Sequence, residues 1–173
     1  MASEWFPGDG RAPEGEAFLA ELRVRATAWG LADVRAEDSG TARDRWGWLV
    51  AWVRVPGLRA GAAGLQLQAG LGLTAATPPL VAAWAADGAL LDCWEELDPF
   101  PYDCSPTGRS HRAYDWFGEQ LRRPVERLCW RTRRHGTTSL LRLADSGDPI
   151  WAEPAARRRL GRGTRPDDVV RLR

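Results

Sequence analysis

Apolar side chains recur at helical spacing in two stretches of the chain. Residues 13–29 begin with a proline, carry glutamates in the first turn and end at Gly30, as expected for the two ends of a helix. Residues 110–123 begin with Ser110 as a candidate N-cap and stop at Pro124. The apolar stripes are Phe18, Leu22, Ala26 and Trp29 in the first helix and Ala113, Tyr114, Phe117 and Leu121 in the second. Both helices are therefore expected to lie on a core.

Between these helices the apolar pattern changes to the period of two that is typical of strands. Three strands are predicted at about 33–38, 46–55 and 64–73, and their order with short turns favours an antiparallel meander. The middle strand is apolar on both faces except for Arg54, so it should be central and covered. The third strand alternates apolar residues with glutamine and glycine, so one of its faces is expected to be polar or open.

An alanine-rich run follows the third strand. A threonine cap and a proline at the first helical position predict a helix at about 78–87 that ends at Gly88, and residues 89–97 are expected to continue as helix. The alternative is a β-hairpin that turns at Asp87. Alanine has a low strand propensity, so the helix is favoured.

The C-terminal part is predicted to be mainly strands. Residues 125–130 and 138–143 form a β-hairpin, followed by short strands at 150–152 and 168–172 with a basic helical turn between them. Together these elements predict a single α+β domain over residues 1–173. Its antiparallel sheet consists of the meander extended by the C-terminal hairpin, and about three helices pack on it.

Composition adds bounds to this picture. The hydrophobic content of 44% and charged content of 27% are ordinary for a globular protein. The absence of lysine and asparagine among the 173 residues is attributed to the codon bias of a GC-rich bacterial genome. Residues 1–12 are rich in turn formers and are expected to be a flexible arm, unless Trp5 and Phe6 dock it on the body.

The charge and the apolar runs bear on location. The net charge of +1 provides no overall field that would attract nucleic acid or an anionic membrane. Residues 1–17 lack the pattern of a secretory signal, and no apolar run reaches the length of a membrane span. We therefore expect a cytoplasmic protein without membrane contact. Its three cysteines, an odd number without close pairing, are expected to be reduced thiols.

One face of the predicted middle strand gathers aromatic and basic side chains, namely Trp46, Trp48, Trp52 and Arg54. Pairing near residues 50 and 70 would place beside them Gln66, Gln68, Gly70 and Gly72. We call this set the tryptophan face. It is a candidate site for a planar or sugar-like ligand or for a protein partner. The alternative is that a helix covers it, and we expect Trp48 to be a core residue.

A second candidate surface combines carboxylates with aromatic rings, namely Asp92, Trp94, Glu95, Glu96, Asp98, Phe100, Tyr102 and Asp103. This acidic aromatic surface is suited to a basic protein partner, and carboxylates in such numbers also suit acid–base chemistry or a divalent metal. A solvated helix end is the structural alternative. We expect Trp94 and Tyr102 to contact a partner.

No complete catalytic or cofactor signature is present. Cys104 or Ser105, with His111 and Asp115, supplies a nucleophile, a base and a carboxylate, but no glycine-rich nucleophile turn accompanies them. The residues of zinc-ligand type are Cys93, Cys104, His111 and Cys129. They lack the close pairs of structural zinc sites. We therefore assign no catalytic residue and expect no cofactor and no metal.

Five arginines gather near the C-terminus, namely Arg157, Arg158, Arg159, Arg162 and Arg165. No aromatic residues interleave with them, and Asp167 and Asp168 follow closely. Nucleic-acid binding is therefore not favoured by the sequence.

The order of a helix, three strands, a glycine-containing loop and a helix resembles the acetyl-CoA-binding core of the GCN5-related acetyltransferases. The segment from Leu67 to Gly72, LQAGLG, is similar to the R/Q-x-x-G-x-G/A loop of that family, and Tyr114 is similar to the tyrosine of its later helix. The resemblance implies an acyl-CoA-dependent transferase whose loop N–H groups bind a pyrophosphate at a helix N-terminus.

These patterns favour a non-enzymatic cytoplasmic protein-binding domain, such as an immunity-type inhibitor, a chaperone or an assembly component. A small acyl-CoA-dependent transferase is one alternative. A module that binds a small ligand on the tryptophan face is another.

Overall fold

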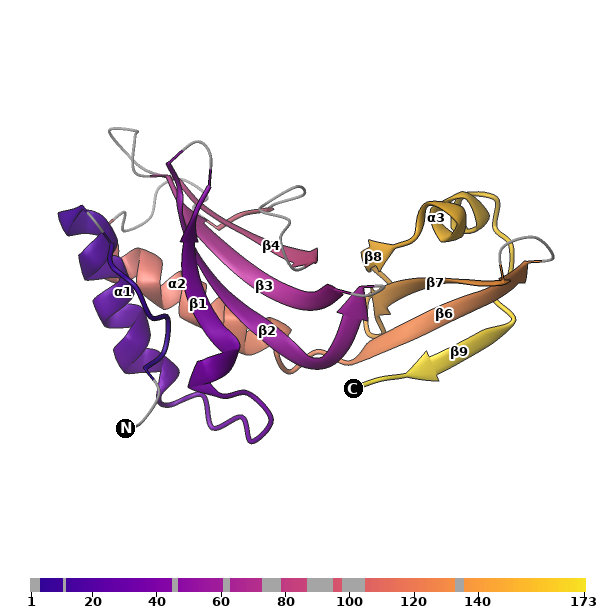
Figure 1. Ribbon diagram of the computed structural model, residues 1–173, viewed down its shortest axis with the longest axis horizontal. Helices are drawn as coiled ribbons and strands as arrows, with labels where there is room; N and C mark the ends of the chain where they lie inside the picture. The colour runs from indigo at the N-terminus through magenta and orange to yellow at the C-terminus, as the bar shows by residue number, and fades with distance from the viewer. Residues whose placement is uncertain are drawn as a thin grey trace. The chain divides into compact units, whose positions relative to one another are not determined.

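The computed structural model describes residues 4–10, 12–44, 47–60, 63–72, 79–86, 95–97, 105–132 and 136–173. These residues form three α-helices and nine strands in two antiparallel sheets, which confirms the predicted α+β fold (Figure 1). The chain divides into two compact units. The N-terminal unit comprises Met1–Pro56 and Leu65–Leu121, and the C-terminal unit comprises Gly57–Gly64 and Arg122–Arg173. That the whole chain folds as one domain stays a prediction.

The first helix of the N-terminal unit is α1, Pro13–Ala26. It confirms the predicted helix and ends three residues earlier than expected. Pro13 opens the helix, and acidic residues in its first turn face the positive end of the helix dipole. The Glu16 carboxylate also accepts a hydrogen bond of 2.7 Å from the Gly10 N–H, which ties the preceding segment to the helix start.

Residues 4–10 are docked on this unit, in the arrangement that the sequence offered as the alternative to a flexible arm. The Phe6 side chain is fully buried. Its N–H donates to the Ser39 hydroxyl at 2.8 Å, and its carbonyl accepts from the Arg23 guanidinium at 3.2 Å. Phe6 also stacks on Phe117 of the last helix of the unit, with 5.9 Å between the ring centroids.

The sheet of this unit is a meander in chain order, β1-β2-β3-β4-β5. Its strands are β1 Ser39–Arg43, β2 Leu49–Ala60, β3 Ala63–Leu71, β4 Leu80–Ala86 and β5 Glu95–Glu96. Gly40 of β1 lies opposite Trp52 of β2, and Gln68 of β3 lies opposite Ala83 of β4. The predicted meander is therefore confirmed, with two strands more than expected.

The first predicted strand, 33–38, was wrong. Residues Ala36–Asp38 form a short 3₁₀ helix, and β1 begins only at Ser39. The reason is local, because the Asp38 carboxylate accepts a hydrogen bond from the Arg35 N–H at 3.1 Å and closes a turn. Strand β1, Ser39–Arg43, thus lies in the segment that was expected to be the turn between the first two predicted strands.

The predicted helix at 78–87 was also wrong, and its expected continuation in 89–97 fails at β5. Residues Leu80–Ala86 are strand β4, paired along its whole length with β3. Alanine favours a helix only weakly, and the hydrogen-bond ladder with β3 outweighs that preference. The hairpin alternative thus gave the right element type for β4, while its turn at residue 87 lies outside the described residues.

The second helix, α2, spans Pro106–Gln120 rather than the predicted 110–123. Its N-cap is Ser105, whose hydroxyl accepts from the Gly108 N–H at 3.0 Å. Ser110 lies inside the helix, where its hydroxyl donates to the Phe18 carbonyl of α1 at 2.7 Å. The expected cap is therefore a link between the two helices.

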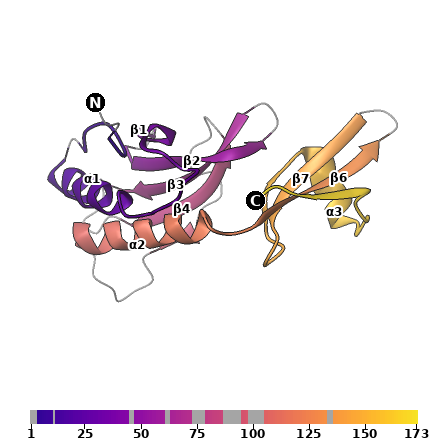
Figure 2. The ribbon, with the colours of Figure 1, turned by 90° about the horizontal axis from the view of Figure 1, so that it is seen from below.

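Helices α1 and α2 pack together on one face of the sheet (Figure 2). The side chains of the strands that point to this face include Leu49, Val53 and Leu67, all at most 1% exposed. Trp84 of β4 points to the same face, because its indole N–H donates to the Gln120 side chain of α2 at 3.2 Å. The opposite face of the sheet is packed by neither helix.

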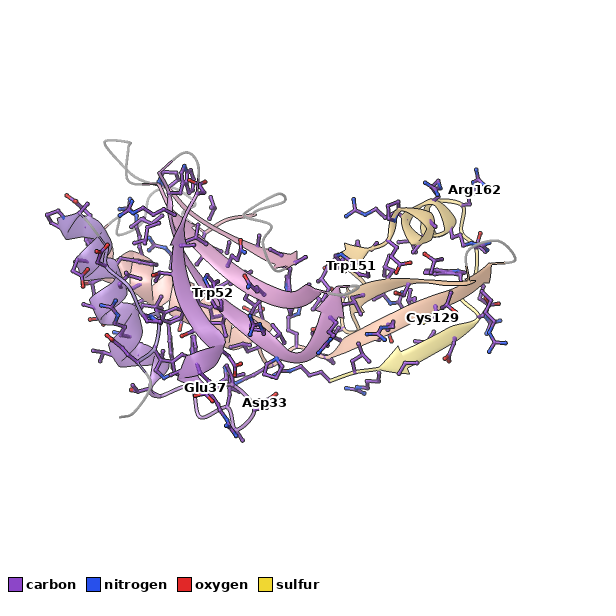
Figure 3. The ribbon with its side chains drawn as sticks, viewed as in Figure 1. Asp33, Glu37, Trp52, Cys129, Trp151 and Arg162 are labelled. Carbon is purple, nitrogen blue, oxygen red and sulfur yellow. The ribbon has the colours of Figure 1, made fainter. Side chains whose placement is uncertain are left out.

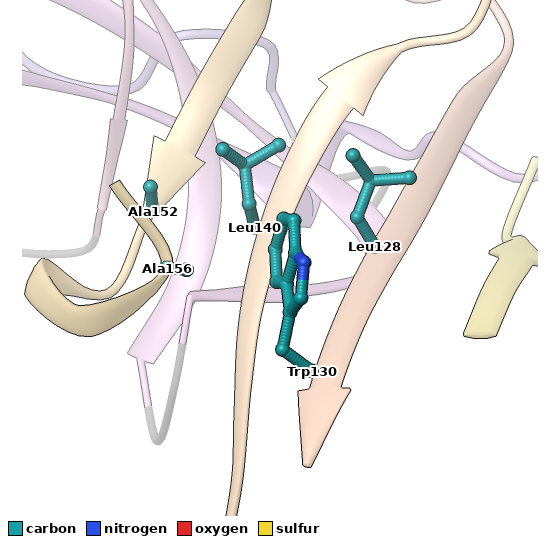
Figure 4. Packing of buried hydrophobic residues seen from close by; sticks show 5 residues of the cluster. All are labelled: Leu128, Trp130, Leu140, Ala152 and Ala156. Atoms are coloured by element: carbon teal, nitrogen blue, oxygen red, sulfur yellow. The ribbon is translucent and has the colours of Figure 1, made fainter. Parts of the chain in front are cut away.

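The C-terminal unit confirms the predicted hairpin, the two short strands and the basic helical turn. Its strands are β6 Val125–Thr132, β7 Gly136–Leu143, β8 Pro149–Ala152 and β9 Asp168–Arg171, and its helix is α3 Pro154–Gly161. They form a separate sheet of order β8-β7-β6-β9, so the hairpin does not extend the meander as expected. A small core fixes α3 on this sheet and consists of Leu128, Trp130, Leu140, Ala152 and Ala156 (Figure 4).

Candidate functional site

The tryptophan face lies on the side of the N-terminal sheet opposite to α1 and α2. Along β2, Leu49, Ala51 and Val53 point to the helices, so Trp52 and Arg54 point away from them. Trp52, labelled in Figure 3, is partly exposed, and Arg54 is exposed. The expectation that a helix covers this face is not met by any described helix.

The two tryptophans of this face that the structure describes, Trp48 and Trp52, each lie against a glycine, which is Gly72 directly after β3 for Trp48 and Gly40 of β1 for Trp52. A Cβ atom placed on Gly40 would stand 2.3 Å from the ring of Trp52, so only glycine leaves room for this ring on β1. A Cβ atom on Gly72 would stand 3.2 Å from the ring of Trp48 and 3.2 Å from Pro79. The indoles therefore lie close to the backbone of the sheet, and packing fixes their positions.

Arg54 extends over Trp52 on the same face. Its guanidinium carbon lies 6.0 Å from the centre of the Trp52 ring, within the range of a cation–π contact. Trp48 and Trp52 are both partly exposed, so the expectation that Trp48 is a core residue was wrong. Among the described residues, the exposed part of the face thus includes two fixed indoles and a guanidinium. Trp46 lies outside the described residues.

The glutamines contribute differently from the expectation. Gln68 is fully buried and Gln66 is 7% exposed, and the Gln68 side-chain amide donates to the Gln66 side-chain oxygen at 3.2 Å. They lie on the same face as Trp48, since Gly72 of the same parity contacts that ring. The predicted grouping is thus present, but its amides are buried polar groups with hydrogen-bond partners rather than an exposed surface.

The glycine loop of the acetyltransferase resemblance is part of the sheet. Gly70 pairs with Val81 in the β3–β4 ladder, and the Gly72 N–H donates to the Pro79 carbonyl at 3.1 Å. The next described element is strand β4, where the resemblance requires a helix. The loop N–H groups and the helix dipole that hold a pyrophosphate are therefore not arranged here as that fold arranges them.

The candidate catalytic residues do not form a triad among the described residues. The His111 Nε2 atom lies 3.3 Å from the Glu21 carboxylate of α1, on the outside of the helix pair. Arg25 and His111 both hydrogen-bond to Glu21, with Arg25 the stronger influence, and they lower the pKa of that carboxyl. Ser105 is engaged as the cap of α2, and Asp115 is exposed. Cys104 lies outside the described residues.

The structure describes only some of the residues to which the metal and thiol predictions refer. Cys129 of β6 is a free, partly buried thiol, and burial raises its pKa. Within the part of the chain that the structure describes, no group of three or more His, Cys, Asp or Glu side chains is placed to hold a metal ion. Cys93 and Cys104 lie outside that part.

The acidic aromatic surface is not testable from the described residues. The side chains concerned are Asp92, Trp94, Glu95, Glu96, Asp98, Phe100, Tyr102 and Asp103. Only the backbone of Glu95 and Glu96 is described, as strand β5. The partner role of Trp94 and Tyr102 stays a prediction.

Comparison with protein-family models, with curated proteins and with solved structures gives no match for this chain. Among the described helices, none combines the length and the apolar character that crossing a membrane requires.

Proposed function

We propose that this chain is a non-enzymatic protein-binding domain, and that its partner docks on Trp48, Trp52 and Arg54 of the tryptophan face. Immunity-type inhibitors, chaperones and assembly components are the classes of protein that such a domain would serve. The observation that carries the proposal is the exposed Arg54 over the fixed ring of Trp52, on the face that neither helix packs against.

Tryptophan and arginine are the residues most enriched among those that dominate binding energy at interfaces. A ring already fixed by packing loses little rotamer freedom on binding, so more of its contact energy appears as affinity. The packing of Trp52 on Gly40 supplies that preorganisation.

The test is purification of the tagged chain from its source cells, followed by native mass spectrometry. The wild type, Trp52→Ala and the control Val24→Ala are compared. Val24 is also an apolar surface residue, 68% exposed, but it lies on α1. We expect a stoichiometric protein partner with the wild type and the control, and its loss with Trp52→Ala.

Other outcomes of the same experiment would replace the proposal. A retained small molecule that is lost with Trp52→Ala would identify a ligand-binding module. The same bound species in all three chains would remove the tryptophan face as a site.

The transferase alternative has a test of its own, which is the melting temperature with acetyl-CoA. If the chain bound this ligand, a concentration of 100 times the Kd would add about 2.7 kcal/mol to stability. We expect no shift in melting temperature at millimolar acetyl-CoA.

A further inference from the structure

The two compact units carry opposite net charges. The C-terminal unit contains fifteen arginines and six carboxylates, a net charge of +9, while the N-terminal unit contains nine arginines and seventeen carboxylates, a net charge of −8. The whole-chain value of +1 is the sum of these two values. The field near the C-terminal unit is therefore strongly positive, contrary to what the total suggests.

The positive charge is concentrated on α3 and the turn that follows it. Five arginines lie there, namely Arg157, Arg158, Arg159, Arg162 and Arg165. All are exposed except Arg159, which is partly exposed. Among the described residues, their side chains form no ion pair. We call these five residues the α3 arginine cluster.

Four of the six carboxylates of the C-terminal unit have partners outside the cluster, and the one closest to it in the sequence, Asp167, accepts a hydrogen bond from the Arg131 N–H at 2.5 Å. Asp145 pairs with Arg123 at 2.8 Å, and Glu126 pairs with Arg142. Glu153 accepts from the Thr138 hydroxyl at 2.7 Å. These carboxylates therefore have partners of their own and do not pair with the α3 arginine cluster.

The backbone that carries the cluster is fixed. Ala156 anchors α3 in the small core beneath it. The Trp130 indole N–H donates to the Thr164 carbonyl at 3.0 Å, and the Thr164 N–H donates to the Arg159 carbonyl at 3.0 Å. Arg162, in the turn, thus projects from a braced segment at the end of α3 (Figure 3).

We propose that the C-terminal unit binds double-stranded nucleic acid through its phosphate backbone, by means of the α3 arginine cluster. Guanidinium groups match phosphate oxygens with paired hydrogen bonds, and such contacts need no sequence readout. This activity is additional to the proposed protein binding and uses none of the residues of the tryptophan face.

The surroundings of the cluster favour a duplex over other anionic partners. On α3 the one large apolar side chain that is clearly exposed is Leu160, at 42%. One leucine provides neither the apolar centre of a protein interface nor the apolar face of a membrane-bound helix. The segment 154–166 that carries the cluster contains no aromatic residue, so the cluster has no stacking platform of its own for single strands.

Neutralising about five phosphates gives a slope of about −4.5 for log affinity against log salt concentration. Raising the salt concentration from about 50 to about 200 mM should therefore weaken binding about 500-fold. The experiment measures the anisotropy of a labelled 20-base-pair duplex, DNA or RNA, with the full chain.

Two double variants test the cluster, Arg158→Gln with Arg162→Gln, and Arg157→Gln with Arg165→Gln. Each should reduce the slope to about −2.7, since two phosphate contacts are lost. The control is Arg35→Gln, another exposed arginine but in the acidic unit, and it should leave the slope unchanged. Thermal melting checks that each variant is folded.

Three further arms address the competing partners, namely polyglutamate, phosphatidylserine vesicles and sedimentation of the chain alone. Weaker binding to polyglutamate and to the phosphatidylserine vesicles than to the duplex supports the proposal. Equal or tighter binding to either one overturns it. It is also overturned if the double variants keep the wild-type slope, or if the chain self-associates at low salt through the same arginines.

Discussion

Replacing Phe6 by alanine tests whether the N-terminal segment is part of the core. Phe6 is fully buried, and its ring lies 5.9 Å from that of Phe117 and 6.0 Å from that of Trp29, measured between centroids. Loss of a buried phenylalanine costs about 3–5 kcal/mol through transfer and cavity terms. A domain of ordinary stability has only about 5–15 kcal/mol in total, so Phe6→Ala should remove a large fraction of the free energy of unfolding.

The backbone of Phe6 provides a second, independent check. Its φ is 48°, in the left-handed region that is unfavourable for residues with a side chain. Alanine keeps this strain of about 1–2 kcal/mol, and glycine does not. Phe6→Gly should therefore be no less stable than Phe6→Ala, although glycine usually destabilises a folded chain.

Urea unfolding followed by circular dichroism measures these differences. The control is Val24→Ala, at a position that is 68% exposed, which should change stability by less than about 0.5 kcal/mol. If Phe6→Ala costs less than about 1 kcal/mol, residues 4–10 are a loose arm and the docked arrangement is wrong.

Three further predictions follow from local geometry and charge. Gly40→Ala should cost about 1–3 kcal/mol because its Cβ would stand 2.3 Å from the Trp52 ring, and the same change should cease to destabilise in a Trp52→Ala background, as urea unfolding of both pairs will show. Hydrogen bonding from the Gly10 N–H lowers the pKa of the Glu16 carboxyl below 4.5 in the folded chain. The stability that this carboxylate contributes is therefore present above the pKa of the unfolded chain and is lost as the pH falls through the pKa of the folded chain. Thermal melts between about pH 5 and pH 3 should show this loss of stability, and Glu16→Gln should make the melting temperature less dependent on pH in that range. Burial raises the pKa of Cys129 above 9.0, so iodoacetamide at about pH 8 should label its peptide more slowly in the native than in the unfolded chain, and equal rates would contradict the burial.

The elements that the sequence predicted well are those whose local signals agree with their surroundings. The proline and the glutamates at the start of α1 mark its beginning, and the apolar stripe marks its buried side. The hairpin of β6 and β7 is flanked by turn residues and carries strand formers. In both cases the long-range packing requires what the local pattern prefers.

The elements that were missed depend on distant partners. Strand β4 is alanine-rich, and only its pairing with β3 makes it a strand. Serine is a common N-cap residue, but the Ser110 hydroxyl donates to the carbonyl of Phe18, far away in the sequence, and so links the two helices. Single-sequence patterns contain no information on such partners.

For the candidate site, the sequence placed Trp48 and Trp52 on one face, and the structure bears this out. It did not identify Gly40, because β1 had been placed too early in the chain. A glycine opposite a tryptophan on the neighbouring strand would have been the signal, once the correct strand was known. The charge of the C-terminal unit was missed because the division into two units is not visible in a net charge of +1.

The central claim is that Trp52 and Arg54 together form a partner-binding surface. The most direct measurement is calorimetric titration of the co-purified partner into the wild type, Trp52→Ala, Arg54→Ala and the double variant, with urea unfolding of each. We predict that Trp52→Ala weakens binding by at least about 2 kcal/mol, and that the two losses are not additive because the side chains are in contact. Unchanged affinity in all three variants, with the fold intact, would contradict the claim.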